Sequence, residues 1–219
     1  MVSRQRILLA ALAAAGVVAG VVVGWSGLDT VNGCGLPANR WPSESTRDWV
    51  ENADVVVVGR AVRERESGRE KLAVGAYRYD VRRTVTLVRE SVLFESRLRG
   101  HPAVGDSVDV AAPGWKEPRS GGVLVPQVTG DAPRIEVGHV YVLALRRDGD
   151  AWRGIGEGGV VPFDGHVVGQ GEWCGQTVTT DDFAEGERFG RHEDDSLEKV
   201  TLGEGVQAVE RELRRAGRG

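Results

Sequence analysis

Polar and apolar residues alternate most clearly between residues 77 and 87, where the pattern predicts a half-buried strand. One face of this strand carries polar side chains, and the other carries Tyr77, Tyr79, Val81, Val85 and Leu87. A period of two with one apolar face is typical of an antiparallel strand that covers a core. Arg83 interrupts the apolar face. We expect the strand to continue to residue 93 and to bend, so that it serves two parts of a barrel.

Shorter strand patterns occupy much of the chain between residues 53 and 168. Four successive valines predict a buried strand within residues 53–62. Residues 137–147 are apolar on both faces and predict a second strong strand. Weaker patterns predict strands at residues 107–111, 123–125, 151–155, 160–163 and 166–168.

Turn and loop signals separate these strands. Asp148-Gly149-Asp150 predicts a hairpin, and Asp164-Gly165 suits a two-residue type I′ turn. Residues 63–71 are charged and contain a Ser-Gly pair, so we expect a solvated loop there. Residues 113–133 are rich in Gly and Pro and are expected to form a long loop. The strands follow one another without the strand–helix–strand alternation of a nucleotide-binding parallel sheet.

Helical patterns lie on both sides of the strand region. Residues 43–52 predict a short helix with Ser43 or Ser45 as its N-cap. Near the C-terminus, Thr201 and Glu204 have the spacing of a capping box, and apolar residues follow at helical spacing to residue 216. This amphipathic helix is expected either to pack on the barrel or to be a docking arm for a partner. The expected fold class is therefore all-β, or β-dominated, with an antiparallel barrel, a short N-terminal helix and a C-terminal amphipathic helix.

An apolar segment near the N-terminus predicts the membrane as a partner. Residues 7–28 are 22 residues without a charge, which is enough to cross a hydrocarbon core of about 30 Å as a helix. Arg4 and Arg6 precede this segment, so the positive-inside rule places the following chain outside the cytoplasm. We expect residues 1–28 to be a signal-anchor of a single-pass membrane protein. A signal peptide that is cleaved to give a secreted protein is the alternative.

The length and the charge of the chain after residue 28 limit its expected domains and partners. Residues 29–42 are expected to be a tether, residues 43–176 one barrel domain with its own core, and residues 177–219 an acidic loop with the terminal helix. Two of the 28 basic residues precede the apolar segment, which leaves 26 against 32 acidic residues, a net charge of −6. This excess of negative charge disfavours nucleic acid and anionic surfaces as partners.

The chain has two cysteines, Cys34 and Cys174. Two cysteines in an exported protein favour one disulfide, because that compartment is oxidising. Two alternatives remain open. Cys34 follows Val31-Asn32-Gly33, a weak match to a lipoprotein box, and is then acylated. Cys174 follows His166 by eight residues, and is then the thiol nucleophile of a cell-envelope enzyme.

No other residues form a recognisable catalytic, cofactor-binding or metal-binding pattern. The sequence has neither a Gly-x-Ser-x-Gly elbow nor a phosphate-binding loop. The acidic residues between 181 and 195 lack the spacing of an EF-hand, and zinc-ligand spacing is absent from His101, His139, His166 and His192. Trp115, in the expected loop at 113–133, is a candidate contact for a partner or a glycan, with packing on the barrel as the alternative.

Two strings on either side of the long alternating strand carry a family resemblance. They are Val50-Glu51-Asn52-Ala53-Asp54-Val55-Val56-Val57-Val58-Gly59-Arg60-Ala61-Val62 and Gly138-His139-Val140-Tyr141-Val142-Leu143. Together they resemble the netrin-module and metalloproteinase-inhibitor-like OB domains over residues 34–168, and the chain is also similar to small exported actinobacterial proteins of unknown function. The resemblance implies a five-stranded OB-like barrel. It does not imply protease inhibition, because Cys34-Gly35-Leu36 lacks the Cys-x-Cys of those inhibitors.

The expected function is therefore that of a membrane-tethered extracytoplasmic module. It binds a ligand, such as an envelope protein or a glycan, without catalysing a reaction. A cell-envelope enzyme that uses Cys174 is the alternative from a different class of function.

Overall fold

Strands dominate this structure. It is a computed structural model, and it describes residues 34–35, 41–97, 100–129, 132–173, 176–178 and 195–218. All of these residues belong to one compact unit, Val31–Gly219. The largest sheet has seven strands. The predicted β-dominated class is thereby confirmed.

Five strands of the large sheet form a ring. In ring order they are β2 (Val55–Lys71), β3 (Tyr77–Glu95), β4 (Ser107–Pro118), β8 (Ala151–Gly154) and β7 (Val140–Asp148). The ring closes because β7 also pairs with residues 55–60 of β2. Every pair is antiparallel except β4–β8, which is parallel. The sheet is extended by β5 (Val125–Pro126) beside β4 and by β9 (Val160–Pro162) beside β7.

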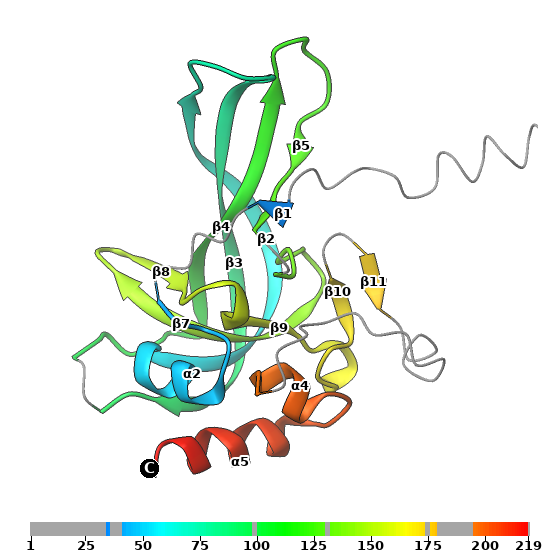
Figure 1. Cartoon of the computed structure of the whole chain (residues 1–219). Helices are drawn as coiled ribbons and strands as arrows, with labels where there is room; N and C mark the ends of the chain where they lie inside the picture. Colours follow the sequence, from blue (N-terminus) through cyan, green and yellow to red (C-terminus); the bar gives the residue numbers. More distant parts are fainter. Residues whose placement is uncertain are drawn as a thin grey trace, which may run out of the picture. The chain divides into compact units, whose positions relative to one another are not determined.

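Shorter elements lie around the ring. The helices are α2 (Thr46–Asn52), α4 (Leu197–Thr201) and α5 (Val206–Ala216), and the 3-10 turns are η1 (Glu157–Gly159) and η2 (Asp164–His166). Two strand pairs stand apart from the large sheet, namely β1 (Cys34–Gly35) with β6 (Val128–Thr129) and β10 (Gly171–Trp173) with β11 (Gln176–Val178). In Figure 1 the helices lie at one end of the ring, and parts of β2, β3 and β4 rise from the other end.

Alternation along β2 and β7 separates two apolar cores. The residues that face into the ring are Val55, Val57, Tyr141, Leu143 and Leu145. Those that face outward, toward the helices, are Val56, Val58, Val140, Val142 and Ala144. Both strands are therefore buried on both faces, which explains why their sequences are continuous apolar runs and not alternating ones.

The helices cover the outer core. The Trp49 side chain of α2 is fully buried, and its indole N–H donates to the carbonyls of Ser43 at 2.8 Å and Gly158 at 2.9 Å. Val209 and Leu213 of α5 pack into the same core. Of the two alternatives for the C-terminal helix, packing on the ring is the one observed. Ser45 is the N-cap of α2, as one of the two expected candidates.

Beyond the ring, β2, β3 and β4 continue together as a three-stranded extension, which we call the ribbon (residues 63–71, 77–83 and 112–118). The expectation of a solvated loop at residues 63–71 is wrong, because these residues pair with β3 as far as Lys71 opposite Tyr79. The expected long loop at 113–133 is also wrong at its start, since β4 runs through Pro118. Most residues of its two outer strands, 63–71 and 112–118, are exposed or half-buried, so these two strands lack the apolar face that predicted the strand at residues 77–83.

A type I′ turn forms one residue later than predicted, with Gly165 and His166 as its two central residues, and without the predicted hairpin. The amide of Val167 donates to the Asp164 carbonyl at 3.2 Å, and Gly165 and His166 both have positive φ, as a type I′ turn requires. Residues 166–168 are nevertheless not a strand. The amide of Val168 donates instead to the Glu204 carbonyl at 2.9 Å, which ties this segment to the chain between α4 and α5.

The predicted capping box at Thr201 and Glu204 is wrong. Thr201 is the last residue of the short helix α4, and its hydroxyl donates to the Leu197 carbonyl at 2.7 Å. Gly205 is the N-cap of α5, with no side-chain cap. The helix itself spans residues 206–216, so its predicted end is confirmed, whereas it begins later than a cap at Thr201 would place it.

Several predictions lie outside the described residues. These are the apolar segment at 7–28, Cys174, His192 and the acidic residues from 181 to 194. Cys34 is described by its backbone alone, in β1. The helices that the structure describes are all too short or too polar to span a membrane.

Candidate functional site

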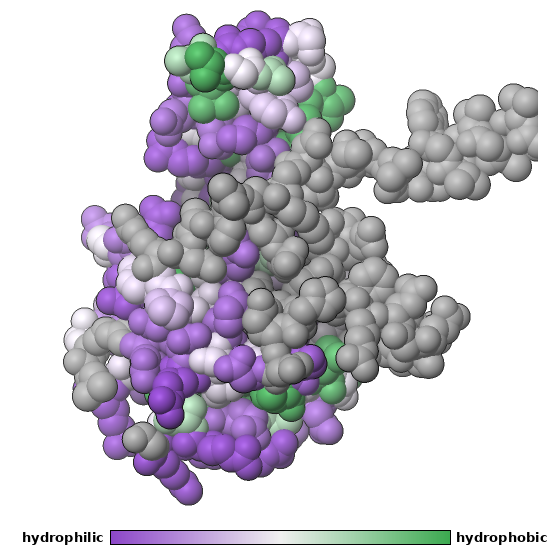
Figure 2. Space-filling view, in the orientation of Figure 1, coloured by the Kyte–Doolittle hydropathy of each residue, from purple (hydrophilic) through white to green (hydrophobic). Residues whose placement is uncertain are grey.

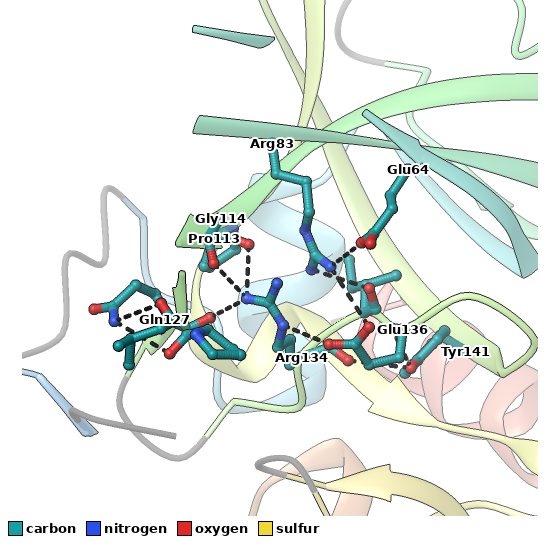
Figure 3. A network of polar contacts seen from close by, with 11 residues as sticks. Glu64, Arg83, Pro113, Gly114, Gln127, Arg134, Glu136 and Tyr141 are labelled. Atoms are coloured by element: carbon teal, nitrogen blue, oxygen red, sulfur yellow. Dashed lines mark hydrogen bonds and ion pairs between the residues drawn. The ribbon is translucent and has the colours of Figure 1, made fainter. Parts of the chain in front are cut away.

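A polar network with two buried arginines lies where the ribbon leaves the ring, and we call it the arginine network (Glu64, Arg83, Trp115, Arg134 and Glu136). Figure 3 shows its two arginines and two glutamates. Arg83 comes from the inward face of β3 and is fully buried. Its guanidinium donates to Glu64 of β2 at 2.6 Å and to the carbonyl of Ile135 at 3.0 Å. The Glu136 carboxylate lies 3.7 Å away. One buried cation therefore ties two strands of the ribbon to the segment before β7.

Arg134 is the second buried cation of the network. Its guanidinium donates to three carbonyls, those of Pro113 at 3.1 Å, Gly114 at 2.7 Å and Gln127 at 2.5 Å, and also to the Glu136 carboxylate. Figure 3 shows these groups converging on the guanidinium from β4 and from the chain after β5. Arg134 thereby joins the middle of β4 to the chain after β5 through backbone carbonyls on both sides.

Trp115 packs against both arginines. The guanidinium carbons of Arg83 and Arg134 lie 5.6 and 5.3 Å from the centroid of its ring, within the range of cation–π attraction. Trp115 belongs to β4 and is half-buried. Its expected position in a loop is therefore wrong, and packing accounts for its contacts in this structure.

The charges of the arginine network balance, two arginines against two glutamates. Burial, and after it the neighbouring charge of Arg83, lower the pKa of Arg134 from its ordinary value. The two glutamates are about one-third exposed, so the network is open to water on one side only. Burying such charges costs desolvation energy, so the ion pairs add little to the net stability of the fold. The network joins β2, β3 and β4 at the base of the ribbon to the segment before β7.

Gly114 makes the close contact between β3 and β4 possible at this point. A Cβ at this position would lie 1.8 Å from the Val81 carbonyl oxygen. The pairing register of the two strands shifts between Val81 and Arg83, next to this contact. The bulge and the glycine together allow the Gly114 carbonyl to reach Arg134.

Ion pairs across the strands hold the ribbon along its length. Arg69 of β2 contacts Glu117 of β4 at 2.6 Å, and Lys116 contacts Asp80 of β3 at 3.0 Å. At the base, Asp109 accepts a hydrogen bond from the Thr86 hydroxyl at 2.6 Å and contacts Arg65 at 3.1 Å. The Thr86 hydrogen bond, and then Arg65, hold the pKa of Asp109 below its ordinary value. These charged edges also disfavour pairing with further strands.

The far end of the ribbon, which we call the ribbon tip (residues 72–76 and 119–124), is apolar instead. Val74 is 83% exposed and Val123 is 86% exposed, the two highest values among the large exposed apolar residues. Figure 2 shows apolar side chains gathered at this end, among hydrophilic neighbours. Arg119 joins the two segments, because its guanidinium donates to the carbonyls of Gly75 at 2.9 Å and Leu72 at 2.6 Å. The two loops of the ribbon tip are thus joined to each other at the end of the ribbon, whose strands carry charged side chains.

Two histidines pair with carboxylates outside the arginine network. His139 Nδ1 lies 2.5 Å from Asp164, and His166 Nε2 lies 3.1 Å from Glu90. Asp164 also accepts from the Val140 amide at 2.7 Å, so it fixes the start of β7. Across the part of the chain that the structure describes, no group of three or more His, Cys, Asp or Glu residues is placed to hold a metal ion.

The sequence indicates only part of this arrangement. Arg83 is visible there as a charge on an apolar face, which is the signal of a buried ion pair. Arg134 carries no such signal, because it lies in an irregular segment between strands. Val74 and Val123 give no signal in the sequence, because single apolar residues in Gly-containing loops form no periodic pattern. The predicted contact residue, Trp115, belongs to the arginine network, and the predicted partner of Cys34, Cys174, is outside the described residues.

No protein-family model matches this sequence, and no curated protein matches it either. The function of the chain must therefore be inferred from its fold and from the contacts of its residues.

Proposed function

We propose that the ring is an OB-like barrel that presents the ribbon as a binding arm. The order β2-β3-β4-β8-β7, closed by β7 on β2 and with β4–β8 as its one parallel pair, supports this proposal. OB folds are five-stranded Greek-key barrels that bind ligands through the loops between their strands. The ribbon prolongs the connection between the first two strands of the ring.

The protein is a membrane-tethered extracytoplasmic module that binds a partner without catalysis, and the ribbon tip is its contact surface. The observation that carries this proposal is the exposure of Val74 and Val123. Each would be stabilised by about 1.5 kcal/mol or more on burial. An apolar surface on a projecting arm marks a site of contact with another molecule.

The construction of the arm supports the same function. The arginine network fixes the base of the ribbon, and ion pairs connect its three strands. A support that is ordered before binding lowers the entropy cost of association. The membrane tether is residues 7–28, followed by the chain to Cys34, and a bridge from Cys34 to Cys174 completes the proposed module.

In situ photo-crosslinking tests the contact surface. A benzophenone amino acid replaces Val74 or Val123 in the full chain, in its native membrane. Val200 of α4, which is 47% exposed, is the matched control position. We expect covalent adducts from positions 74 and 123 and none from position 200. Equal adduct yields at all three positions, or none at the tip, would contradict the proposal.

The competing function is that of a thiol enzyme. It requires Cys174 to be free and to have a base beside it. His166, the histidine nearest to it in sequence, contacts Glu90 at 3.1 Å and has an exposed side chain. Alkylation before and after reduction separates the two functions, because an enzyme labels at Cys174 without reduction and the binding module does not.

A further inference from the structure

The ribbon tip combines its apolar side chains with positive charge. Lys71, Arg78 and Arg119 are exposed around the two loops. Residues 71–79 and 118–129 contain no Asp or Glu. The chain outside residues 1–28 has a net charge of −6, so the tip differs in sign from the module as a whole. Exposed apolar residues surrounded by basic side chains are the combination that binds the interface of an anionic bilayer.

β1 lies beside a segment that continues from the ribbon tip. β1 begins at Cys34. β1 pairs with β6, where Cys34 lies opposite Val128. Val128 is in turn only five residues from Val123, which spans at most about 17 Å. The chain therefore enters the module beside the segment that leads back to the ribbon tip.

We propose that the ribbon tip inserts into the anionic headgroup layer of the bilayer that anchors the chain. Val74 and Val123 enter the boundary between headgroups and acyl chains, while Lys71, Arg78 and Arg119 face the lipid phosphates. This inference rests on the proposed function, because it needs the tether and takes the tip as the contact surface. It adds the class of partner, an anionic lipid surface, and a fixed orientation of the module on the membrane.

A neutral or protein partner fits the same residues less well. A protein groove would cover the valines but does not account for three cations without an acidic residue in the two segments. On a neutral lipid surface the valines would still be buried, but the three basic residues would add nothing to the binding free energy. Each basic residue near an anionic surface favours binding by a factor of about five.

Hydrogen–deuterium exchange of the full chain in nanodiscs tests the proposal. The discs contain either phosphatidylcholine alone or a mixture of phosphatidylcholine and phosphatidylglycerol. We expect amide exchange in residues 72–76 and 120–124 to slow about tenfold in the anionic discs relative to the neutral ones. The turn between β7 and β8 is the internal reference, and its exchange stays the same in both discs.

Variants separate the two components of the contact. Val74→Ser with Val123→Ser removes the protection in both kinds of disc, whereas the matched control Val200→Ser keeps it. Lys71→Gln with Arg78→Gln lowers protection in anionic discs to the level of neutral discs. Exchange at the tip that is the same in anionic and neutral discs overturns the lipid proposal. If the crosslinks at position 74 are then to a protein, the contact surface stands and its partner is not a lipid.

Discussion

Arg83 occupies a position of β3 where the alternation of apolar residues requires an apolar side chain. It is buried, and its partners are Glu64 of β2 and the Ile135 carbonyl. At the scale of single residues, a buried arginine therefore occupies a position at which most strands have a packed apolar side chain. Removing one partner of such a group leaves the others unpaired.

Arg83→Met should lower the free energy of unfolding by about 2 kcal/mol. The loss is at the low end for a buried pair, because Glu64 is 34% exposed and water can solvate it when Arg83 is removed. The matched control is Arg82→Met on the exposed face of the same strand, which should change stability by less than about 0.5 kcal/mol. Chemical denaturation of both variants is the measurement. Equal losses would show that Arg83 has no special structural role.

Gly114→Ala should destabilise the protein by about 2 kcal/mol or more, because the new methyl group meets the Val81 carbonyl. Gly100→Ala is the control, since a Cβ there has no heavy atom within 4 Å. Thermal unfolding followed by circular dichroism compares the two variants. A Gly114→Ala protein as stable as the Gly100→Ala protein would disprove the close approach of β3 and β4.

Asp109 should make stability fall in acid. Its pKa is lowered in the folded state by the Thr86 hydroxyl and by Arg65, so its contribution is complete above the pKa of the unfolded chain, about 4. The contribution is lost as the pH falls from there through the folded pKa. The effect is expected to be below about 1 kcal/mol, because the side chain is 46% exposed. Asp109→Asn should flatten this part of the stability–pH curve, and an unchanged curve would remove Asp109 as its source.

At the scale of elements, the sequence predicts strands wherever one or both faces are apolar. Val55 to Val58 and the run of β7 are recognisable because the ring buries one face and the helices bury the other. The prediction of loops at residues 63–71 and 113–118 failed because these two strands of the ribbon have no apolar face. Hydrogen bonds and ion pairs to their neighbours hold them in the sheet. The capping box failed because Thr201 ends one helix and does not begin the next. The spacing of Thr201 and Glu204 alone cannot distinguish a residue that begins a helix from one that ends it.

The C-terminal helix was expected either to pack on the ring or to be a docking arm, and its buried residues show that it packs. Leu213 of α5 is 1% exposed in the outer core, so Leu213→Ala should cost about 3 kcal/mol. Arg211→Ala, on the exposed face of the same helix, should cost less than about 0.5 kcal/mol. Urea denaturation distinguishes the two. A tolerated Leu213→Ala would mean that α5 is a detachable arm.

At the scale of the whole molecule, the proposed contact surface is separate from the parts that stabilise the fold. The two cores and the arginine network hold the ring and the base of the ribbon, and the ribbon tip adds exposed apolar surface without packing. The candidate disulfide and the membrane segment are predictions from the sequence that lie outside the described residues. They supply the tether in the proposed function, and the ribbon supplies the contact.

Val74→Ser with Val123→Ser should leave the free energy of unfolding within about 0.5 kcal/mol of the parent, because neither side chain is buried. The same double variant should lose the crosslinks formed from a benzophenone at position 124. Denaturation and crosslinking are measured on the same preparation. A variant that loses stability together with its crosslinks would mean that the tip belongs to the fold.

The central claim is that the chain is an anchored module with a bridged pair of cysteines, and not a thiol enzyme. The most direct test is the intact mass of the protein from its native membrane, alkylated before and after reduction. The predicted result is a mass that retains residues 1–28, with two alkyl groups added only after reduction. Cysteines that alkylate without reduction, or a shortened chain that begins at Cys34 and carries lipid, would contradict the claim.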